Sequence, residues 1–276
     1  MISVAVASIH IYPLKAARAV DLDDALVEPW GLAGDRRWLL VDVTGRFISQ
    51  REEPAMTRVV VRYAGPGGDV SVSSDGHGEM SFAAPAPETG AKMLSVTVWS
   101  ATVLAAAAGK DADKWFSAFL DRPVHLVYLD DPTRRPVDPE YGTPGDVVSF
   151  ADGYPLLLTN AGSLDTLADW LVETGAAPVP MNRFRPNVVV TGAEPWAEDR
   201  WRRVKIGDVG FRVAKPCGRC VVTTTDQRTG ERGSQPLKML GRRRRFGQQL
   251  VFGQNLIPGG TGTIRTGDPV RILETG

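Results

Sequence analysis

Short runs of β-branched and aromatic residues, separated by turn-forming sequences, constrain this chain more than any other feature. The first half contains four such runs, at residues 4–12, 36–43, 46–50 and 58–64, with turn sequences such as LAGD and VTGR beside them. Runs of this length and composition are typical of β-strands. The 29 glycines and 20 prolines favour many turns over long helices. The sequence therefore predicts a fold made mainly of short strands.

The rest of the chain continues this pattern and adds two helices. Strands are expected at 125–130, 147–152 and 187–192, and the segment 95–108 continues the pattern of short strands. The segments 202–215, 220–226 and 262–273 are expected to consist of strand and turn, with a strand beginning at Cys220. One helix is expected at 111–120, where Asp111 can serve as N-cap and Trp115, Phe116 and Leu120 fall on one side. The other is expected at about 161–174. The predicted fold class is mostly β (α+β), a β-barrel architecture with flanking helices.

A chain of 276 residues can form one large domain or two smaller ones, each with a buried core. The segment 130–146, DDPTRRPVDPEYGTPGD, is rich in proline and aspartate and is the best candidate for a linker or inter-domain loop. We therefore expect an N-terminal domain over residues 1–125 and a C-terminal domain over residues 126–276.

Composition argues against several classes of function. The 32 basic and 32 acidic residues cancel, so the overall charge does not favour a nucleic-acid partner. No stretch approaches the length of a membrane span, and the N-terminus lacks the basic start and cleavage site of a signal peptide. Two cysteines cannot form a disulfide framework, so we expect a protein of the reducing cytoplasm. The content of Ala, Arg and Pro fits a GC-rich bacterial genome.

Both cysteines lie in KPCGRCVVTTTDQRTGERG, residues 215–233. A redox dithiol of the C-x-x-C type places its first thiol at a helix N-terminus, whereas the run at 221–225 favours a strand. Zinc needs further ligands, and His10, His77 and His125 are scattered along the chain without ligand spacing. Neither site is favoured by this sequence.

A single anchoring thiolate is a third interpretation of the pair. Pro216 and Gly218 suit a turn, after which Cys220 would begin a strand. In an extended segment Cys217 and Cys220 would face opposite sides, so only one would enter a given cavity. Neighbouring cations would favour a thiolate, and a thiolate suits a thiophilic metal. Two buried, inert cysteines are the alternative.

KPCGRCVVTTTDQRTGE resembles the core motif of the MOSC domain, which is named after the C-terminal part of molybdenum cofactor sulfurases. IYPLKAARAV and GLAGDRRWLLVDVTGRFISQREEP resemble successive blocks of the N-terminal β-barrel domain that accompanies it. RFRPNVVVTG, EDRWRRVKIGD, FGQN and GTIRTGDPVRIL match the family in order and spacing, so the resemblance covers essentially the whole chain. Within this family, the sequence resembles the amidoxime-reducing members, namely the mitochondrial amidoxime reducing component and its bacterial counterparts. A MOSC β-barrel following an N-terminal β-barrel-like domain is implied.

The resemblance also implies a molybdenum cofactor, in which a pterin dithiolene holds molybdenum and carries a phosphate. In the amidoxime-reducing members one cysteine completes the metal coordination, and motif alignment assigns this metal-binding and catalytic role to Cys220. An anionic cofactor held without covalent bonds to its pterin needs cations and amide donors. Family alignment nominates Lys15, Arg36, Arg185, Asn187 and, from FGQN, Asn255.

Three features bear on how far the resemblance extends. Ala16 stands where a serine commonly follows the first-motif lysine, and Ala193 replaces a cysteine found in some relatives. The arginine run at 242–245 has three interpretations: a solvated loop, a lining of the cofactor-phosphate entrance, or a docking site for an acidic electron-transfer protein. The departures at Ala16 and Ala193 affect the expected substrate range and cofactor affinity.

The activity implied is that of a molybdenum-dependent oxidoreductase, which removes oxygen from small N-hydroxylated substrates such as amidoximes, hydroxylamines and N-oxides. Some bacterial relatives carry a plant-type iron–sulfur domain that needs four cysteines, whereas this sequence has two. We therefore expect a separate ferredoxin- or cytochrome-like electron donor. The alternative is a non-catalytic carrier of the cofactor or of sulfur, with persulfide on Cys220.

Overall fold

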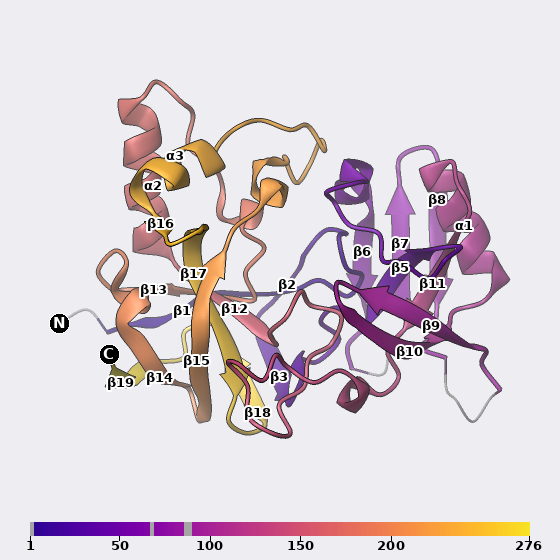
Figure 1. The fold of residues 1–276 in the computed structure, drawn as a ribbon, viewed down its shortest axis with the longest axis horizontal. Helices are drawn as coiled ribbons and strands as arrows, with labels where there is room; N and C mark the ends of the chain where they lie inside the picture. Colours follow the sequence, from indigo (N-terminus) through magenta and orange to yellow (C-terminus); the bar gives the residue numbers. More distant parts are fainter. Residues whose placement is uncertain (1–2, 67–68, 86–89) are drawn as a thin grey trace.

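The computed structural model describes residues 3–66, 69–85 and 90–276, and within them the chain is mostly β (Figure 1). Two lobes lie side by side, with both termini at the far end of the larger one. The larger lobe is built on a nine-stranded sheet of order β19-β14-β15-β17-β12-β13-β1-β2, with β16 paired to β17. Its strands are β1 (Ala5–Ile11), β2 (Val20–Leu22), β12 (Leu156–Asn160), β13 (Val188–Thr191), β14 (Trp201–Ile206), β15 (Val209–Gly218), β16 (Arg245–Phe246), β17 (Gln249–Pro258) and β19 (Val270–Thr275).

The smaller lobe contains two further sheets, of orders β5-β11-β10-β9 and β6-β7-β8. Their strands are β5 (Trp38–Asp42), β6 (Val60–Tyr63), β7 (Val70–Ser74), β8 (Gly78–Phe82), β9 (Met93–Val98), β10 (Ala101–Ala107) and β11 (Val124–Tyr128). A three-stranded sheet of order β18-β3-β4 belongs to the larger lobe; it comprises β3 (Asp24–Glu28), β4 (Gly31–Leu32) and β18 (Gly262–Arg265). The expected fold class, mostly β with few helices, is confirmed.

Strands from the start of the chain pair with strands from its second half. β1 runs antiparallel to β13, with Ile9 opposite Val188, and β3 runs antiparallel to β18, with Ala25 opposite Ile264. Ile9 and Ile11 alternate into one core with side chains of β12, β13 and β17. Val6 joins the same core, although it is three positions from Ile9, because the register of β1 shifts between Val6 and Ser8. The division at residues 125 and 126 therefore stays a prediction, since the larger sheet draws strands from both parts.

The helices pack against strands of the sheets: the first against β11, the second against β12 and β13, and the third against β17. They are α1 (Lys110–Leu120), α2 (Ala161–Glu173) and α3 (Leu237–Arg243). The first two were expected, but Asp111 is not the N-cap of α1: that position is Gly109, with φ +112°, and Asp111 lies in the first turn. Asn160 caps α2 by accepting a hydrogen bond of 3.1 Å from the amide of Gly162.

Two predicted strands are irregular in the structure. The run 46–50 makes only isolated bridges, between Phe47 and Val41 and between Arg46 and Thr97. The run 147–152 is a loop, and backbone carbonyls of this loop accept hydrogen bonds from the buried side chains of Arg135 and Lys15. Apolar composition alone cannot separate such a buried loop from a strand, because both place their side chains in a core.

The predicted strand at 220–226 is also wrong. Residues Val221–Thr224 form the 3-10 helix η6, with Cys220 as its N-cap residue. The threonine hydroxyls bond to carbonyls three residues earlier: Thr223 donates to Cys220 O at 2.9 Å, and Thr224 donates to Val221 O at 2.8 Å. Such local bonds give threonine an alternative to strand pairing.

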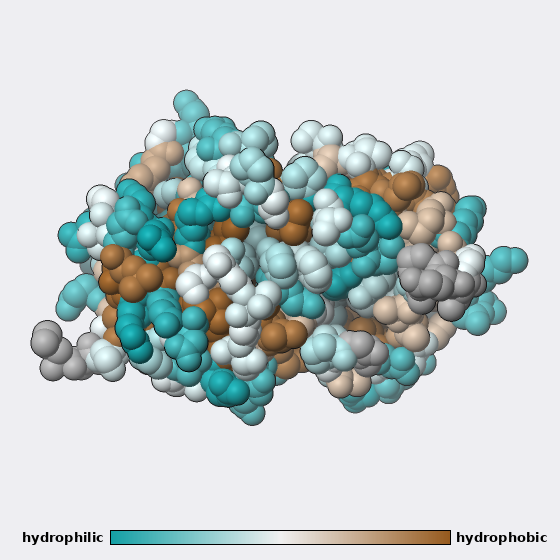
Figure 2. Space-filling view, turned by 90° about the horizontal axis from the view of Figure 1, so that it is seen from below, coloured by the Kyte–Doolittle hydropathy of each residue, from teal (hydrophilic) through white to brown (hydrophobic). Residues whose placement is uncertain are grey.

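The described residues also form the 3-10 helices η1 (Pro54–Arg58), η3 (Pro132–Arg134), η4 (Met181–Arg183) and η5 (Ala197–Arg200). Of these, η3 is the regular structure within the proline-rich segment 130–146, which leads from β11 toward β12. Across the described ranges, no helix has the length and apolar character needed to span a bilayer. On the face shown in Figure 2, apolar patches are interrupted by hydrophilic residues.

Candidate functional site

A cavity of about 370 Å³ lies where loops of the smaller lobe meet the ends of strands in the larger lobe. Its described lining has a strong excess of positive charge: six basic side chains stand against one carboxylate, that of Asp152. The basic residues are Lys15, Arg36, Arg51, Arg185, Lys215 and Arg219. A concave site with this balance is suited to an anion, because each guanidinium or ammonium group supplies both charge and directed N–H donors.

Both cysteines line this cavity, from the end of β15 and the start of η6. The expectation that only one of them would enter a given cavity is wrong; the pairing of β15 with β17 is irregular between Pro216 and Gly218, so simple alternation does not hold there. An arginine lies at each sulfur: Arg51 Nη2 is 3.1 Å from Cys220 Sγ, and Arg219 Nη1 is 2.9 Å from Cys217 Sγ. The two thiols are free and partly exposed, so they are not inert core residues.

Lys15 reaches the cavity from the loop that follows β1. Its ammonium group donates to Phe150 O at 2.7 Å and to Asp152 Oδ1 at 2.5 Å. Burial lowers the pKa of Lys15 to about 8, although the carboxylate of Asp152 opposes this shift. Burial alone would raise the pKa of Asp152, but the charge and hydrogen bond of Lys15 outweigh it and hold that pKa below its ordinary value.

Arg36 and Asn187 form one hydrogen-bonded unit at the base of the cavity. Arg36 Nη1 donates to Asp35 Oδ2 at 2.5 Å and to Asn187 Oδ1 at 3.1 Å. The Asn187 amide also accepts from the Leu157 backbone and donates to His10 O. Asn187 is 1% exposed, so its amide is committed to protein partners and its visible effect is to position Arg36.

Arg185 lies beside this unit and shares an aromatic neighbour with it. The guanidinium groups of Arg36 and Arg185 lie 4.4 and 4.1 Å from the ring centroid of Tyr12. Arg185 Nη1 donates to Gln227 Oε1 at 3.0 Å. Burial, together with the nearby charge of Arg36, lowers the pKa of Arg185 to about 10. Both arginines are therefore cationic at neutral pH.

The backbone around the cavity is strained at three side-chain-bearing residues. Ala16, Arg36 and Arg185 have φ values of +73°, +49° and +54°, in the left-handed region that L-residues avoid. All three line the cavity. Strain of this kind costs of order 1–3 kcal/mol per residue and is maintained where the surrounding structure fixes a functional geometry. The sharp turns direct the Arg36 and Arg185 side chains inward.

The last predicted residue, Asn255, lines the wall formed by β17. Its Nδ2 lies 3.4 Å from Lys215 O and 3.5 Å from Pro216 O, so it supports the segment that leads to the cysteines. Lys215 itself lies over the ring of Tyr141 at 4.0 Å. The structure thus brings all six predicted residues, Cys220 included, to one cavity; their roles there stay a prediction.

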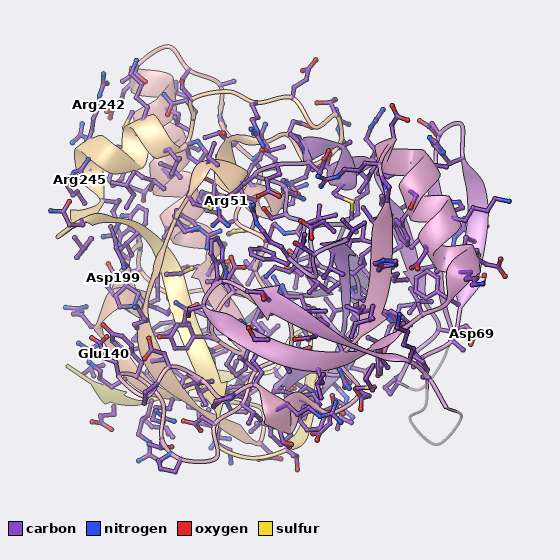
Figure 3. All side chains as sticks on the ribbon, turned by 45° about the vertical axis from the view of Figure 1, so that its right-hand side comes forward. Arg51, Asp69, Glu140, Asp199, Arg242 and Arg245 are labelled. Carbon is purple, nitrogen blue, oxygen red and sulfur yellow. The ribbon has the colours of Figure 1, made fainter. Side chains whose placement is uncertain are left out.

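Sequence reasoning missed Arg51 and Asp152. Arg51 is 169 positions before Cys220, so local spacing gave no signal. Its guanidinium group also lies 4.4 Å from the ring centroid of Trp99. Figure 3 shows Arg51 toward the middle of the view, away from the outer edge where Arg242 and Arg245 lie. The buried charge of Lys15 was the one clue that a carboxylate should lie near it.

The arginine run at 242–245 lies away from the cavity. None of its described side chains is part of the lining, and Figure 3 places Arg242 and Arg245 at the outer edge. Arg244 is buried and pairs with Asp199 at 2.6 Å. Of the interpretations left open for this run, the lining of the entrance is contradicted, and partner docking stays a prediction.

Comparison with known proteins gives the family. Residues 3–123 match the MOSC N-terminal beta barrel domain and residues 145–271 match the MOSC domain. The chain belongs to the MOSC family.

Among relatives, Mitochondrial amidoxime-reducing component 1 of Mus musculus is 30% identical, and that of Homo sapiens is 29% identical. Each alignment covers 97% of this chain and 82% of the relative. Molybdenum cofactor sulfurase of Solanum lycopersicum is 28% identical over 89% of this chain but only 32% of its own length.

Proposed function

We propose that this protein is a molybdenum-cofactor-dependent reductase of small N-hydroxylated compounds: amidoximes, hydroxylamines and N-oxides. The observation that carries the proposal is the thiol of Cys220 in a cavity lined by six basic side chains and one carboxylate. The relatives named for amidoxime reduction support it, because they align over nearly all of this chain and most of their own length.

The residues present fit the cofactor. Its phosphate and its anionic dithiolene require positive charge, which Lys15, Arg36 and Arg185 supply from one side of the cavity. Arg219 contributes a buried Nε without a hydrogen-bond partner among the described residues, so a donor is available there. Cys220 supplies a soft sulfur donor in the same lining, and the volume of about 370 Å³ is that of a small-ligand pocket.

The cofactor would supply two-electron chemistry at molybdenum, which takes oxygen from the substrate nitrogen. The chain itself would orient and neutralise that group. Cys220 would be the protein ligand, and Arg51 would hold its sulfur in place through the 3.1 Å contact. Lys15 Nζ, with a pKa of about 8, holds its proton at neutral pH, while Asp152 stays ionised beside it. We propose that electrons come from a separate ferredoxin- or cytochrome-like protein.

One experiment tests both the cofactor and the reaction. The protein is purified from a cofactor-competent host, molybdenum per chain is measured by elemental analysis, and benzamidoxime reduction is followed with an artificial electron donor. We expect close to one molybdenum per chain and turnover of benzamidoxime. Absence of molybdenum in protein from such a host would refute the proposal.

The choice of sulfur is tested separately. Cys220→Ala is expected to abolish benzamidoxime reduction, because it removes the proposed ligand, whereas Cys217→Ala is expected to retain most of it. Both thiols lie in the same cavity, each beside an arginine, so the pair is a matched control. The reverse result would transfer the ligand role to Cys217.

A carrier of the cofactor or of its sulfur is the second candidate. The alignment with molybdenum cofactor sulfurase and the presence of two thiols in one cavity favour it. Bound molybdenum without turnover of several N-hydroxylated substrates, or a persulfide on Cys220 detected by mass spectrometry, would identify the protein as a carrier.

A further inference from the structure

A second cavity, of about 380 Å³, shares the lining residue Arg185 with the cysteine-containing cavity. Ser8, His10 and Asp21 line it together. We propose that these three residues form a serine-nucleophile site that hydrolyses small anionic esters, an activity separate from the proposed reductase.

The three side chains have the contacts that a nucleophile, a base and an orienting carboxylate require. Ser8 Oγ is 2.8 Å from His10 Nε2, and Asp21 Oδ1 is 2.6 Å from His10 Nδ1. With its proton on Nδ1, the imidazole donates to Asp21 and accepts from the Ser8 hydroxyl. These are the roles that activate a serine in hydrolases of unrelated folds.

The sheet places the three residues by simple rules. Ser8 and His10 are two positions apart on β1, so their side chains lie on the same face. Asp21 on β2 is directly opposite His10 in the antiparallel register. The register of β1 against β13 shifts between Val6 and Ser8, and such a bulge turns the following side chain toward a new direction. The rigid ladder therefore holds the nucleophile and base together.

Positive charge in this cavity indicates the class of substrate. Arg18, Arg185 and Arg228 line it, and Asp21 is the one carboxylate among its described lining residues. Arg18 uses Nε and one Nη for the carbonyls of Thr57 and Arg228, which leaves donors for a ligand. An ester that carries a carboxylate at its far end fits this arrangement, and a guanidinium group is available to stabilise the oxyanion.

The reaction is balanced without an oxidant or a reductant. Ser8 Oγ bonds to the acyl carbon while its proton passes to His10 Nε2, and the ester C–O bond breaks as that proton moves to the leaving alcohol. Water then repeats the sequence, releasing the acid and restoring the serine. Asp21 is 83% exposed on its side chain, so it orients the imidazole but is screened by solvent.

The test uses the full-length protein with mono-4-nitrophenyl succinate and, as the neutral analogue, 4-nitrophenyl acetate. We expect release of nitrophenolate, with kcat/KM about tenfold higher for the anionic ester. Ser8→Ala and His10→Gln should each lower kcat/KM by about 100-fold or more, and Asp21→Asn by about tenfold, since its carboxylate is exposed. Benzamidoxime reduction should be unchanged in Ser8→Ala.

The matched control is His125→Gln. His125 Nδ1 is 2.7 Å from Asp113 Oδ2, an equivalent His–Asp pair for which no serine contact exists among the described residues, so hydrolysis should be unaffected. A fluorophosphonate probe on the unmodified protein gives a second measurement, which does not depend on any variant folding. Mass spectrometry should locate it on Ser8. Equal hydrolysis by the unmodified protein and Ser8→Ala, or labelling elsewhere, would overturn the proposal.

Discussion

At the scale of single residues, the cysteine-containing cavity is organised by contacts between side chains far apart in the sequence. Arg51 comes from a loop after β5, and Cys220 lies at the start of η6. The guanidinium group stacks on Trp99 at 4.4 Å while it donates to the sulfur at 3.1 Å. The aromatic ring limits the orientations of the arginine, which in turn limits those of the thiol.

Replacing Arg51 tests this positioning. A charge-assisted hydrogen bond contributes about 1.5–3 kcal/mol, so Arg51→Ala should lower benzamidoxime kcat by about 10- to 100-fold. Bound molybdenum, measured on the same samples, shows whether the loss comes from cofactor retention. The control is Arg46→Ala: this arginine is also close to β5, but its side chain is 62% exposed and pairs with Glu52 outside the cavity. Equal loss in both variants would contradict a specific role for Arg51.

Lys15 gives the site a pH dependence. Burial lowers the pKa of this lysine to about 8, so below that pH its ammonium group is charged and attracts the anionic cofactor. A bound anion favours the charged form, so the midpoint in the loaded protein should lie above 8. We expect the molybdenum retained after gel filtration to be constant near neutral pH and to fall at higher pH.

Lys15→Arg is the control for this titration, because arginine stays charged throughout the range. The variant should retain molybdenum at a high pH where the unmodified protein loses it. Identical pH profiles for the two proteins would show that another group controls release.

At the scale of elements, the predictable parts were those where a local pattern and the tertiary environment agree. The strands β1, β13 and β14 lie where strand-like composition was expected, and α2 lies close to the expected range of 161–174. The run at 220–226 has equally strong strand composition. It became η6 because the hydroxyls of Thr223 and Thr224 satisfy backbone carbonyls locally.

The candidate site was predictable only in part, because some of its contacts join residues that are far apart in the sequence. Lys15, Arg36, Arg185, Asn187, Cys220 and Asn255 were nominated by motif resemblance, and the fold brings them to one cavity. Arg51 and the Ser8–His10–Asp21 cluster depend on pairing across strands and loops, which spacing along one sequence does not encode. The register that places His10 opposite Asp21 is fixed by the folded sheet.

Gly253 in β17 offers a test of how an element supports the site. Its φ is +82°, and a Cβ built there would lie 2.6 Å from Leu158 O on the neighbouring strand β12. Gly253→Ala therefore strains the backbone and pushes against a strand that cannot move freely. We expect a loss of roughly 1–3 kcal/mol in the free energy of unfolding, measured by chemical denaturation, and weaker molybdenum binding because β17 also carries Asn255.

The matched control is Gly210→Ala in β15. A Cβ at Gly210 would meet nothing within 4 Å, and its backbone is not in the left-handed region. Its stability should stay within about 0.5 kcal/mol of the unmodified protein. If both variants were equally destabilised, the loss would reflect glycine replacement in a strand rather than the close approach to β12.

At the scale of the whole molecule, the cysteine-containing cavity joins the two lobes. Arg36, Gln50 and Arg51 lie in or next to the turns that flank β5, while Asn187, Cys220 and Asn255 belong to segments of the larger lobe. Hydrogen bonds cross this junction at Gln50 and Gln227 and at Arg51 and Cys220. A ligand in the cavity contacts both sides, so its binding energy adds to the attraction between the lobes.

Cofactor loading should therefore stabilise the entire fold and not just the cavity wall. A ligand that binds only the folded state at 100 times its Kd adds about 2.7 kcal/mol. We expect a higher thermal unfolding midpoint for protein from a cofactor-competent host than for protein from a cofactor-deficient host.

The double variant Lys15→Gln, Arg185→Gln, purified from both hosts, serves as control. Any loss of stability caused by the two substitutions is the same in both preparations of the variant, so it does not affect the difference between them. The two midpoints should coincide, because the variant lacks two of the cations that hold the anion. A host-dependent shift of equal size in this variant would mean that those cations do not hold the cofactor, and no shift in the unmodified protein would mean that nothing binds across the junction.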